Sequence, residues 1–341
     1  MSTKEQVFEY LNNHKSEYVS GSVIALELGV SRNAIWKAIN SLKKDGLVIE
    51  AISNKGYRIL EESDILSSAN VLRYLDNPEE LRVEVFDLVT STNTIAKEKG
   101  SAGEKEGLVI IAKEQSAGKG RMNRSFKSPK GSGVYFSLLL RPKMKPSEAL
   151  YITTIAAVAV ADAIEKITGK ETHIKWVNDI YIGKRKVCGI LTEGSISMEN
   201  GYLDMAIPGI GINIKDPENG WPEEIKNIAG SILKEDEMIE DVSSKLVAYT
   251  LNTFMKYYKT LPDKLFLEEY KKRSIVIGKD VYVIDGNHGN LGSTAEIVKE
   301  YKNELKVAHV MDIDDELGLV VKYEDGSTEV LRSGEVSVRE K

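Results

Sequence analysis

The segment Gln115–Gly133 combines glycines and cations at close spacing. It lies between two apolar segments and is longer than the usual connection of about 2–6 residues, which favours a functional loop. It contains no carboxylate, although the whole chain has a formal net charge of −6, and its cations are Lys119, Arg121, Arg124, Lys127 and Lys130. Gly118 and Gly120 let a ligand approach the backbone, and arginine can hold phosphate oxygens with paired hydrogen bonds. We therefore expect an anion-binding loop; the alternative is a flexible surface loop with scattered charge.

A second polar group lies in Ile174–Leu191. We predict that a strand delivers Lys175, Asn178 and Asp179 at its end, and that the hairpin after it carries Lys186. Cations beside an Asn–Asp pair suit a phosphate with a bridging divalent metal. Taken alone, the same residues are as typical of a plain turn followed by a solvated hairpin tip as they are of a phosphate site.

Two shorter motifs are weaker signals by themselves. Gly209–Asn213 is the glycine-marked end of a predicted strand. Ser91–Asn93 is typical of ligand binding, and at least as typical of the cap of a helix that begins near Thr94.

The sequence gives little support for a metal site, for a nucleophilic serine or cysteine, or for a standard nucleotide-binding loop. The four histidines are scattered without metal-ligand spacing, and Cys188 lies among apolar residues of a predicted strand. The chain has no GxSxG elbow, Walker P-loop or helix-opening GxGxxG. A site rich in Arg, Lys, Asn and Gly but without a nucleophile indicates adenylyl or phosphoryl transfer, with no dedicated metal site in the protein.

The first sixty residues predict three short helices and a hairpin. The third helix, residues 32–45, follows Ser31 as its N-cap and has one apolar stripe; strands are expected at 47–52 and 57–60. This is the winged helix-turn-helix pattern, in which the third helix meets the major groove of DNA. The candidate DNA-binding residues are Ser31, Arg32, Asn33, Trp36, Lys37, Asn40, Lys44 and Lys55. The alternative is a helical protein-interaction domain with a solvated basic face.

The rest of the chain predicts the framework of the candidate site. Strands and helices alternate from Leu81 to about Tyr270, with an apolar helix at 147–168 packed under the sheet and a second helix at 242–259. After Ser274 the pattern is all-β and suits a small barrel, with turns at Asp285-Gly286 and Asp325-Gly326. The expected divisions are a winged helix-turn-helix domain at 1–62, a connector at 63–80, a catalytic domain at 81–272 and the barrel at 273–341.

Composition favours a cytoplasmic globular protein. The chain has 341 residues, of which 42% are hydrophobic and 29% charged, and a single cysteine. The first ten residues lack the apolar core of a signal peptide, and the longest apolar run, residues 150–161, is too short to span a membrane. Any nucleic-acid site must be a local basic patch, since the whole chain is acidic.

Together these motifs resemble the bifunctional biotin protein ligases and biotin operon repressors over the full length of the chain. The resemblance rests on Ser91-Thr-Asn93, Gln115, GKGRMNR (118–124), KWVND (175–179), RKVCGIL (185–191) and GIGIN (209–213). The chain departs from the family pattern at three positions. Lys119 and Asn123 replace Arg and Gly in the usual GRGRxGR loop, and Val177 replaces proline in KWPND. The changes keep the charge and the Asn–Asp pair, so we expect activity, with loop ordering and ligand affinity open to change.

The resemblance implies an α+β multidomain protein: a winged helix-turn-helix, a class II synthetase-like mixed α/β catalytic domain and an SH3-like barrel. It also implies that biotin attacks the α-phosphate of Mg-ATP, with Lys186 and Arg121 as the catalytic residues. Biotin would contact Ser91, Thr92, Asn93, Gln115, Lys119, Gly120, Arg121 and Lys186. ATP and the adenylate would contact Arg121, Arg124, Phe126, Lys175, Asn178, Asp179, Asn213 and Arg339, with Mg²⁺ near Asp179.

The resemblance further implies partners. A lysine of the biotin carboxyl carrier protein of acetyl-CoA carboxylase would take biotin from the adenylate. The adenylate would order loops at a sheet edge, promote a homodimer and so bring two winged domains onto operator DNA. The alternatives are a lipoate-type ligase, which the N-terminal domain and KWVND disfavour, and a ligand-sensing repressor without ligase activity.

Overall fold

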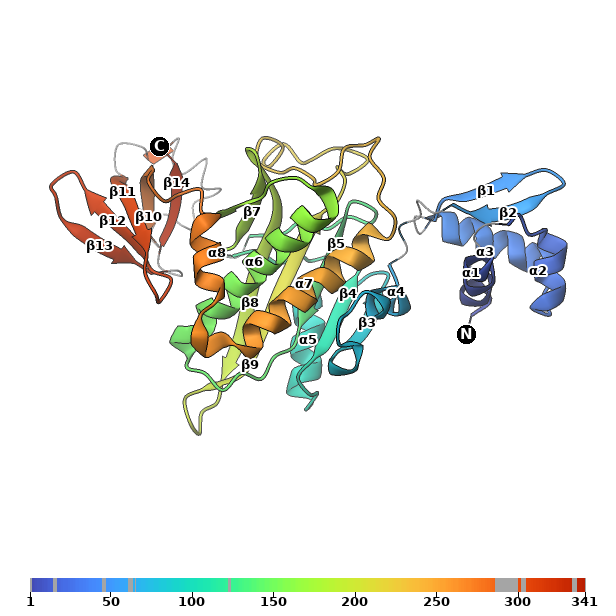
Figure 1. Cartoon of the computed structure of the whole chain (residues 1–341), viewed down its shortest axis with the longest axis horizontal. Helices are drawn as coiled ribbons and strands as arrows, with labels where there is room; N and C mark the ends of the chain where they lie inside the picture. Colours follow the sequence, from blue (N-terminus) through green and yellow to red (C-terminus); the bar gives the residue numbers. More distant parts are fainter. Residues whose placement is uncertain are drawn as a thin grey trace.

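The structure is a computed structural model of the whole chain (Figure 1). It describes residues 2–14, 17–44, 47–60, 64, 66–121, 124–285, 300–301, 305–332 and 336–340. Asn123 of the cationic loop and Gly286 of one predicted turn lie outside the described residues, as do the side chains of Lys44 and Arg339.

The N-terminal region forms the predicted three helices and hairpin. Its elements are α1 (Thr3–Asn13), α2 (Gly21–Glu27), α3 (Arg32–Lys44), β1 (Ile49–Ile52) and β2 (Gly56–Ile59). A serine caps each helix, as the sequence predicts for α3. The hydroxyls of Ser2, Ser20 and Ser31 accept from the backbone N–H groups three residues further along the chain. The helices and the hairpin enclose a hydrophobic cluster of their own, which includes Leu11, Ile24, Ile35 and Ile59. This region lies at one end of the molecule, apart from the large sheet (Figure 1).

The connector contains a helix that the sequence indicates only weakly. Its elements are α4 (Ser68–Arg73) and the short η1 (Pro78–Glu80). Val71 of α4 packs in the main hydrophobic cluster with the helices of the central region. The connector is therefore part of the central body and not a free linker.

The central region is one seven-stranded sheet in the order β3-β4-β5-β9-β8-β7-β6. Only β3 and β4 run parallel, so the sheet is more antiparallel than the predicted alternation of strands and helices suggests. The strands are β3 (Arg82–Phe86), β4 (Leu108–Ala112), β5 (Gly133–Leu138), β6 (His173–Lys175), β7 (Asp179–Ile182), β8 (Arg185–Ile196) and β9 (Leu203–Asn213). The helices are α5 (Thr92–Ser101), η2 (Pro146–Glu148), α6 (Ala149–Thr168), α7 (Val242–Lys259), η3 (Leu261–Asp263) and α8 (Phe266–Lys272).

Helices α6 and α7 cover one face of the sheet, and α5 covers part of the other (Figure 1). Alternate residues of a strand point to opposite faces. Accordingly Val109 and Ile111 of β4 join the cluster under α6 and α7, whereas Leu108 and Ile110 face α5. The helical segment 146–168 is long and apolar enough to span a membrane by composition alone, but 72% of its apolar window is buried inside the molecule. It is the core helix that the sequence predicts.

The C-terminal region is an antiparallel five-stranded sheet in the order β13-β12-β11-β10-β14. Its strands are β10 (Asp280–Asp285), β11 (Lys306–Ile313), β12 (Leu319–Tyr323), β13 (Thr328–Leu331) and β14 (Val336–Glu340). The predicted Asp325-Gly326 turn joins β12 to β13. The indole N–H of Trp176 donates to the carbonyl of Leu317 at 3.0 Å, so the KWVND motif lies where the two sheets meet.

Candidate active site

A buried network of neutral side chains lies at the N-terminus of α5. The backbone N–H of Thr92 donates to Oε1 of Gln115 at 2.8 Å. The hydroxyl of Ser137 lies 2.7 Å from Oγ1 of Thr92 and 2.6 Å from Oδ1 of Asn93. Ser91, Thr92, Asn93 and Ser137 are all at most 4% exposed. These buried polar groups are therefore satisfied by hydrogen bonds within the protein.

Helix α5 begins at Thr92, two residues before the predicted start. Ser91 is its N-cap residue by position, but its side chain makes no capping hydrogen bond. The structure thus gives no side-chain capping role to Ser91, which was the alternative to ligand binding.

The cationic loop folds back on itself as an irregular hairpin. Backbone bridges join Gln115 to Ser128 and Lys119 to Ser125, and the N–H of Gly120 donates to the carbonyl of Arg124 at 2.7 Å. A Cβ atom at Gly118 would lie 2.4 Å from the carbonyl oxygen of Phe126, so this turn requires glycine. The described part of the loop is ordered by its own backbone, which disfavours the alternative of a loosely held surface loop.

Three of the candidate cations are held by polar side chains. Nη1 of Arg121 donates to Oδ1 of Asn178 at 3.0 Å, and Nζ of Lys186 lies 2.7 Å from Oδ1 of Asp179. The Arg121–Asn178 bond joins the loop 115–133 to the KWVND–hairpin segment, and the Lys186–Asp179 ion pair lies within that segment. Burial lowers the pKa of the Arg121 guanidinium, while the charge of Asp179 acts in the opposite direction.

Lys119, the third cation, lies 3.7 Å from the carboxylate of Glu193, whose other oxygen accepts from Nδ2 of Asn93 at 2.8 Å. Sequence reasoning missed both Glu193 and Ser137. A polar residue inside the apolar run VYFSLLL was a usable signal for Ser137, whereas no pattern pointed to Glu193.

Glycines form the floor between these groups. Met205 and Ile207 of β9 pack against α5, and the same face of the strand continues as Gly209 and Gly211. A Cβ atom at Gly209 would lie 2.0 Å from Oδ1 of Asn93. At Gly211 it would lie 2.4 Å from the ring of Phe126. The GIGIN motif thus leaves room for Asn93 and for an aromatic ring on the sheet face opposite α6 and α7.

The remaining nucleotide-side candidates lie on several different segments. Nδ2 of Asn213 donates to the carbonyl of Gly230 at 2.9 Å, so this buried amide holds a loop. Lys175 lies opposite Asp179 in the β6–β7 register, and Arg124 follows Arg121 in the loop. Arg339 lies on β14, paired in register with Tyr282 of β10; the backbone alone places it, on the C-terminal sheet.

The described candidate DNA-binding residues of the N-terminal region are mostly exposed. Arg32, Asn33, Trp36 and Lys37 are exposed on α3, and Asn40 is half-buried on the same helix. Ser31 caps α3, and Lys55 is exposed at the tip of the β1–β2 hairpin. Trp36 is 56% exposed, which is unusual for so large an apolar side chain and is consistent with a contact surface.

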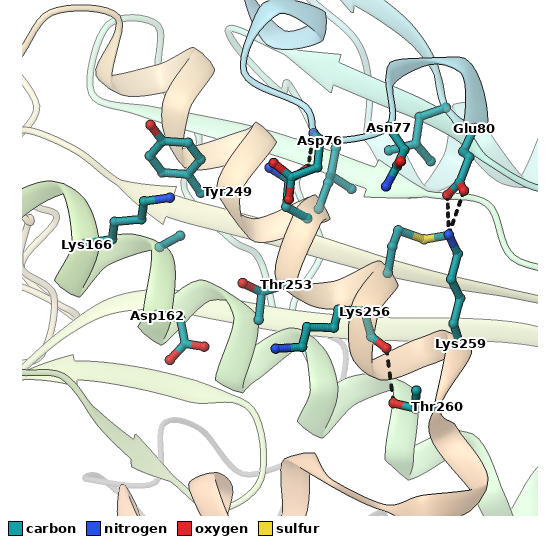
Figure 2. Close-up of a pocket in the computed structure, with 15 residues that line it drawn as sticks. Asp76, Asn77, Glu80, Asp162, Lys166, Tyr249, Thr253, Lys256, Lys259 and Thr260 are labelled. Atoms are coloured by element: carbon teal, nitrogen blue, oxygen red, sulfur yellow. Dashed lines mark hydrogen bonds and ion pairs between the residues drawn. The ribbon is translucent and has the colours of Figure 1, made fainter.

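A groove of the described structure lies elsewhere, on the helical side of the molecule (Figure 2). It has a volume of about 510 Å³ and lies between the connector, α6 and α7. Figure 2 shows Lys166, Lys256 and Lys259 on its walls together with Asp76 and Asp162, so it is a mixed-charge groove. Among the residues that the structure describes, no group of three or more His, Cys, Asp or Glu side chains forms a metal site.

Comparison with known proteins identifies both parts of the chain. Residues 85–213 match the model of the biotin/lipoate A/B protein ligase family, and residues 3–58 match an HTH domain model. The chain is 36% identical over 276 residues to the bifunctional ligase/repressor BirA of Bacillus subtilis, covering 78% of this chain and 83% of that protein.

Solved structures agree with this match. A point mutant of the biotin protein ligase from Aquifex aeolicus, in complex with biotin, superimposes with a TM-score of 0.59 at 25% identity. The Aquifex aeolicus enzyme in complex with biotin and ATP gives 0.58 at 24% identity, which shows the shared fold. Each alignment covers 76% of this chain and 99% of the other.

Fold and site thus define a biotin/lipoate-type ligase domain joined to an N-terminal DNA-binding domain. The chain belongs to the family of the bifunctional biotin ligases and biotin repressors.

Proposed function

We propose that this protein joins biotin to ATP, forming biotinyl-5′-adenylate and pyrophosphate, and then transfers biotin to a lysine of a biotin carboxyl carrier protein. The main structural support is the placement of Arg121 and Lys186 beside the glycine floor, next to the neutral network around Asn93. Family membership supports the acid and the acceptor.

We assign the neutral network to biotin. Thr92, Asn93 and Gln115, with Ser91 beside them, would orient its polar ring, and Lys119, Gly120 and Arg121 would close over it. Thr92, Asn93 and Gln115 have hydrogen-bond partners within the protein, which biotin would replace in part with its own polar groups.

We assign the cations to the reacting centre. Lys186 would hold the biotin carboxylate against the α-phosphate, and Arg121 would neutralise the charge that develops there. Arg124, Phe126, Lys175, Asn178, Asn213 and Arg339 are the proposed nucleotide side. The carboxylate of Asp179 suits a Mg²⁺ ion bound mainly by ATP phosphates and water, since such ions take one or two protein carboxylates.

The same chain is proposed to repress biotin genes in the cytoplasm. Adenylate bound in the site would favour a homodimer, formed where loops meet a sheet edge, and two winged domains would then bind a palindromic operator. The exposed cations and Asn33 of α3 support DNA contact by this helix.

Biotin-dependent exchange of labelled pyrophosphate into ATP tests the first half-reaction, with lipoate as the parallel acid. We expect exchange with biotin alone. Exchange with lipoate alone would make the protein a lipoate-type ligase, and exchange with neither acid would leave a ligand-sensing repressor.

Deleting residues 1–60 tests the N-terminal assignment. We expect the truncated protein to lose operator binding in a gel-shift assay. Retained operator binding would overturn the assignment of DNA contact to the winged domain.

A further inference from the structure

Helix α7 begins at a residue that does not cap it. Asp241 occupies the N-cap position with φ +50°, a backbone conformation that L-residues rarely adopt, and its side chain makes no capping bond. Its buried carboxylate instead accepts from Nδ2 of Asn70 at 3.3 Å and from the hydroxyl of Tyr74 at 3.0 Å. Asp241 thus binds the connector helix α4 rather than its own helix.

The connector supplies the missing cap. Oδ1 of Asp64 accepts from the backbone N–H of Ser243 at 2.9 Å, and the other carboxylate oxygen accepts from the Ser243 hydroxyl. Negative charge is favourable at a helix N-terminus, where the first N–H groups lack partners. Burial raises the pKa of Asp64 to about 6, so the group is still mainly ionised at neutral pH.

The segment that leads into α7 also borders the nucleotide side of the candidate site. The N–H of Lys186 donates to the carbonyl of Ile228 at 2.8 Å, and the N–H of Gly230 returns a bond to Lys186 at 2.9 Å. On its other side Gly230 accepts from the amide of Asn213, whose carbonyl accepts from Ile232 at 3.0 Å. Residues 228–241 therefore run from the strand ends that carry Lys186 and Asn213 to the capped end of α7.

We infer that Asp64 is a positioning residue for the nucleotide side of the site, although it lies in the connector that follows the DNA-binding domain. By capping α7 it holds the far end of residues 228–241, and this segment in turn holds the backbone of Lys186 and the amide of Asn213. The inference rests on the proposed function.

Asp64→Ala should raise the KM for ATP about threefold to tenfold, the range that corresponds to loss of a helix cap, while the KM for biotin stays within twofold. Asp64→Asn should restore most of the lost affinity, since its amide oxygen still accepts from the Ser243 N–H. Pyrophosphate exchange at varied ATP and at varied biotin measures both constants on the full-length chain.

Glu80→Gln is the matched control. It breaks another contact between the connector and α7, the 2.6 Å ion pair with Lys259 near the last turn of the helix (Figure 2). We expect both KM values to stay unchanged. Thermal unfolding of every variant separates a general loss of stability from the specific change in KM.

The possible results distinguish a failure of the proposed ligase function from a failure of the role inferred for Asp64. If the wild-type chain exchanges no pyrophosphate with biotin, the proposed function fails. If the wild-type chain is active and Asp64→Ala leaves the KM for ATP unchanged, or raises both KM values equally, the inference is overturned. Ser243→Ala removes only the hydroxyl contact with Asp64 and should raise the KM for ATP by a smaller factor. This variant replaces Asp64→Ala in the test if Asp64→Ala does not fold.

Discussion

The two halves of the candidate site are built on different principles. The half at the start of α5 consists mainly of neutral groups: Thr92, Asn93, Gln115 and Ser137 are joined by hydrogen bonds, and the amide of Asn93 also donates to Glu193. In the other half, cations have internal partners, Lys186 with Asp179 and Arg121 with Asn178. The half at the start of α5 is thus a set of hydrogen-bonded polar groups. The other half is a set of cations that are paired with side chains of the protein.

This difference between the two halves predicts a different role for each of them in the reaction. A network of neutral groups that is held by internal hydrogen bonds can select the shape and hydrogen-bonding pattern of a ligand at a low cost in ordering. Cations paired with protein acceptors can exchange those partners for phosphate oxygens, and that exchange stabilises charge that develops during reaction. We therefore expect mutations in the neutral half to change biotin affinity, and mutations in the cationic half to change the rate.

The largest effect is expected at Lys186. Lys186→Ala should lower the rate of biotin-dependent pyrophosphate exchange by about 10²–10³-fold, the usual loss for one electrostatic contact to a transition state. Lys184→Ala removes an exposed lysine from the same hairpin and should leave the rate unchanged. Circular dichroism checks that both variants fold. If folded Lys186→Ala keeps its rate, the cationic half has no catalytic role at this residue.

A smaller effect is expected at Ser137 in the neutral half. Ser137→Ala removes the hydroxyl that donates to the buried Oδ1 of Asn93 and contacts the hydroxyl of Thr92, and a buried acceptor left without its donor costs about 1–3 kcal/mol. The Kd for biotin, measured by titration calorimetry, should rise about tenfold while the KM for ATP stays the same. Ser132→Ala, another buried serine that contacts Tyr135 and Pro129 instead, controls for loss of stability alone. Equal losses of biotin affinity in both variants would contradict the separation of the two halves.

The sequence predicted the framework of both halves but not their internal contacts. Glycine spacing, clustered cations and alternating apolar residues are local signals, so the loop at 115–133, the winged domain and helix α7 were recognisable. The floor at Gly209 and Gly211 was a weak signal because a glycine shows its role only when its neighbours are known.

Contacts between segments that lie far apart in the sequence could not be predicted from such local signals. Glu193 meets Asn93 from a strand one hundred residues later in the chain, and Asp64 caps a helix that begins more than 170 residues after it. Neither residue is unusual in its local sequence. Their roles arise from the order of strands in the sheet and from the packing of α4 on α7, which no single segment specifies.

The smallest effect is expected where the halves meet, at Lys119. Its ammonium lies 3.7 Å from Glu193 and is half exposed, so the present ion pair contributes little. Lys119→Arg introduces the planar guanidinium found in the family pattern, which can bond Glu193 and a ligand oxygen at once. Biotinyl-5′-adenylate should then dissociate about twofold to fivefold more slowly in a filter-binding chase. Lys127→Arg, an exposed change in the same loop, should not alter the rate. Faster or equal dissociation from Lys119→Arg would show that this junction does not retain the ligand, and that the two halves act independently.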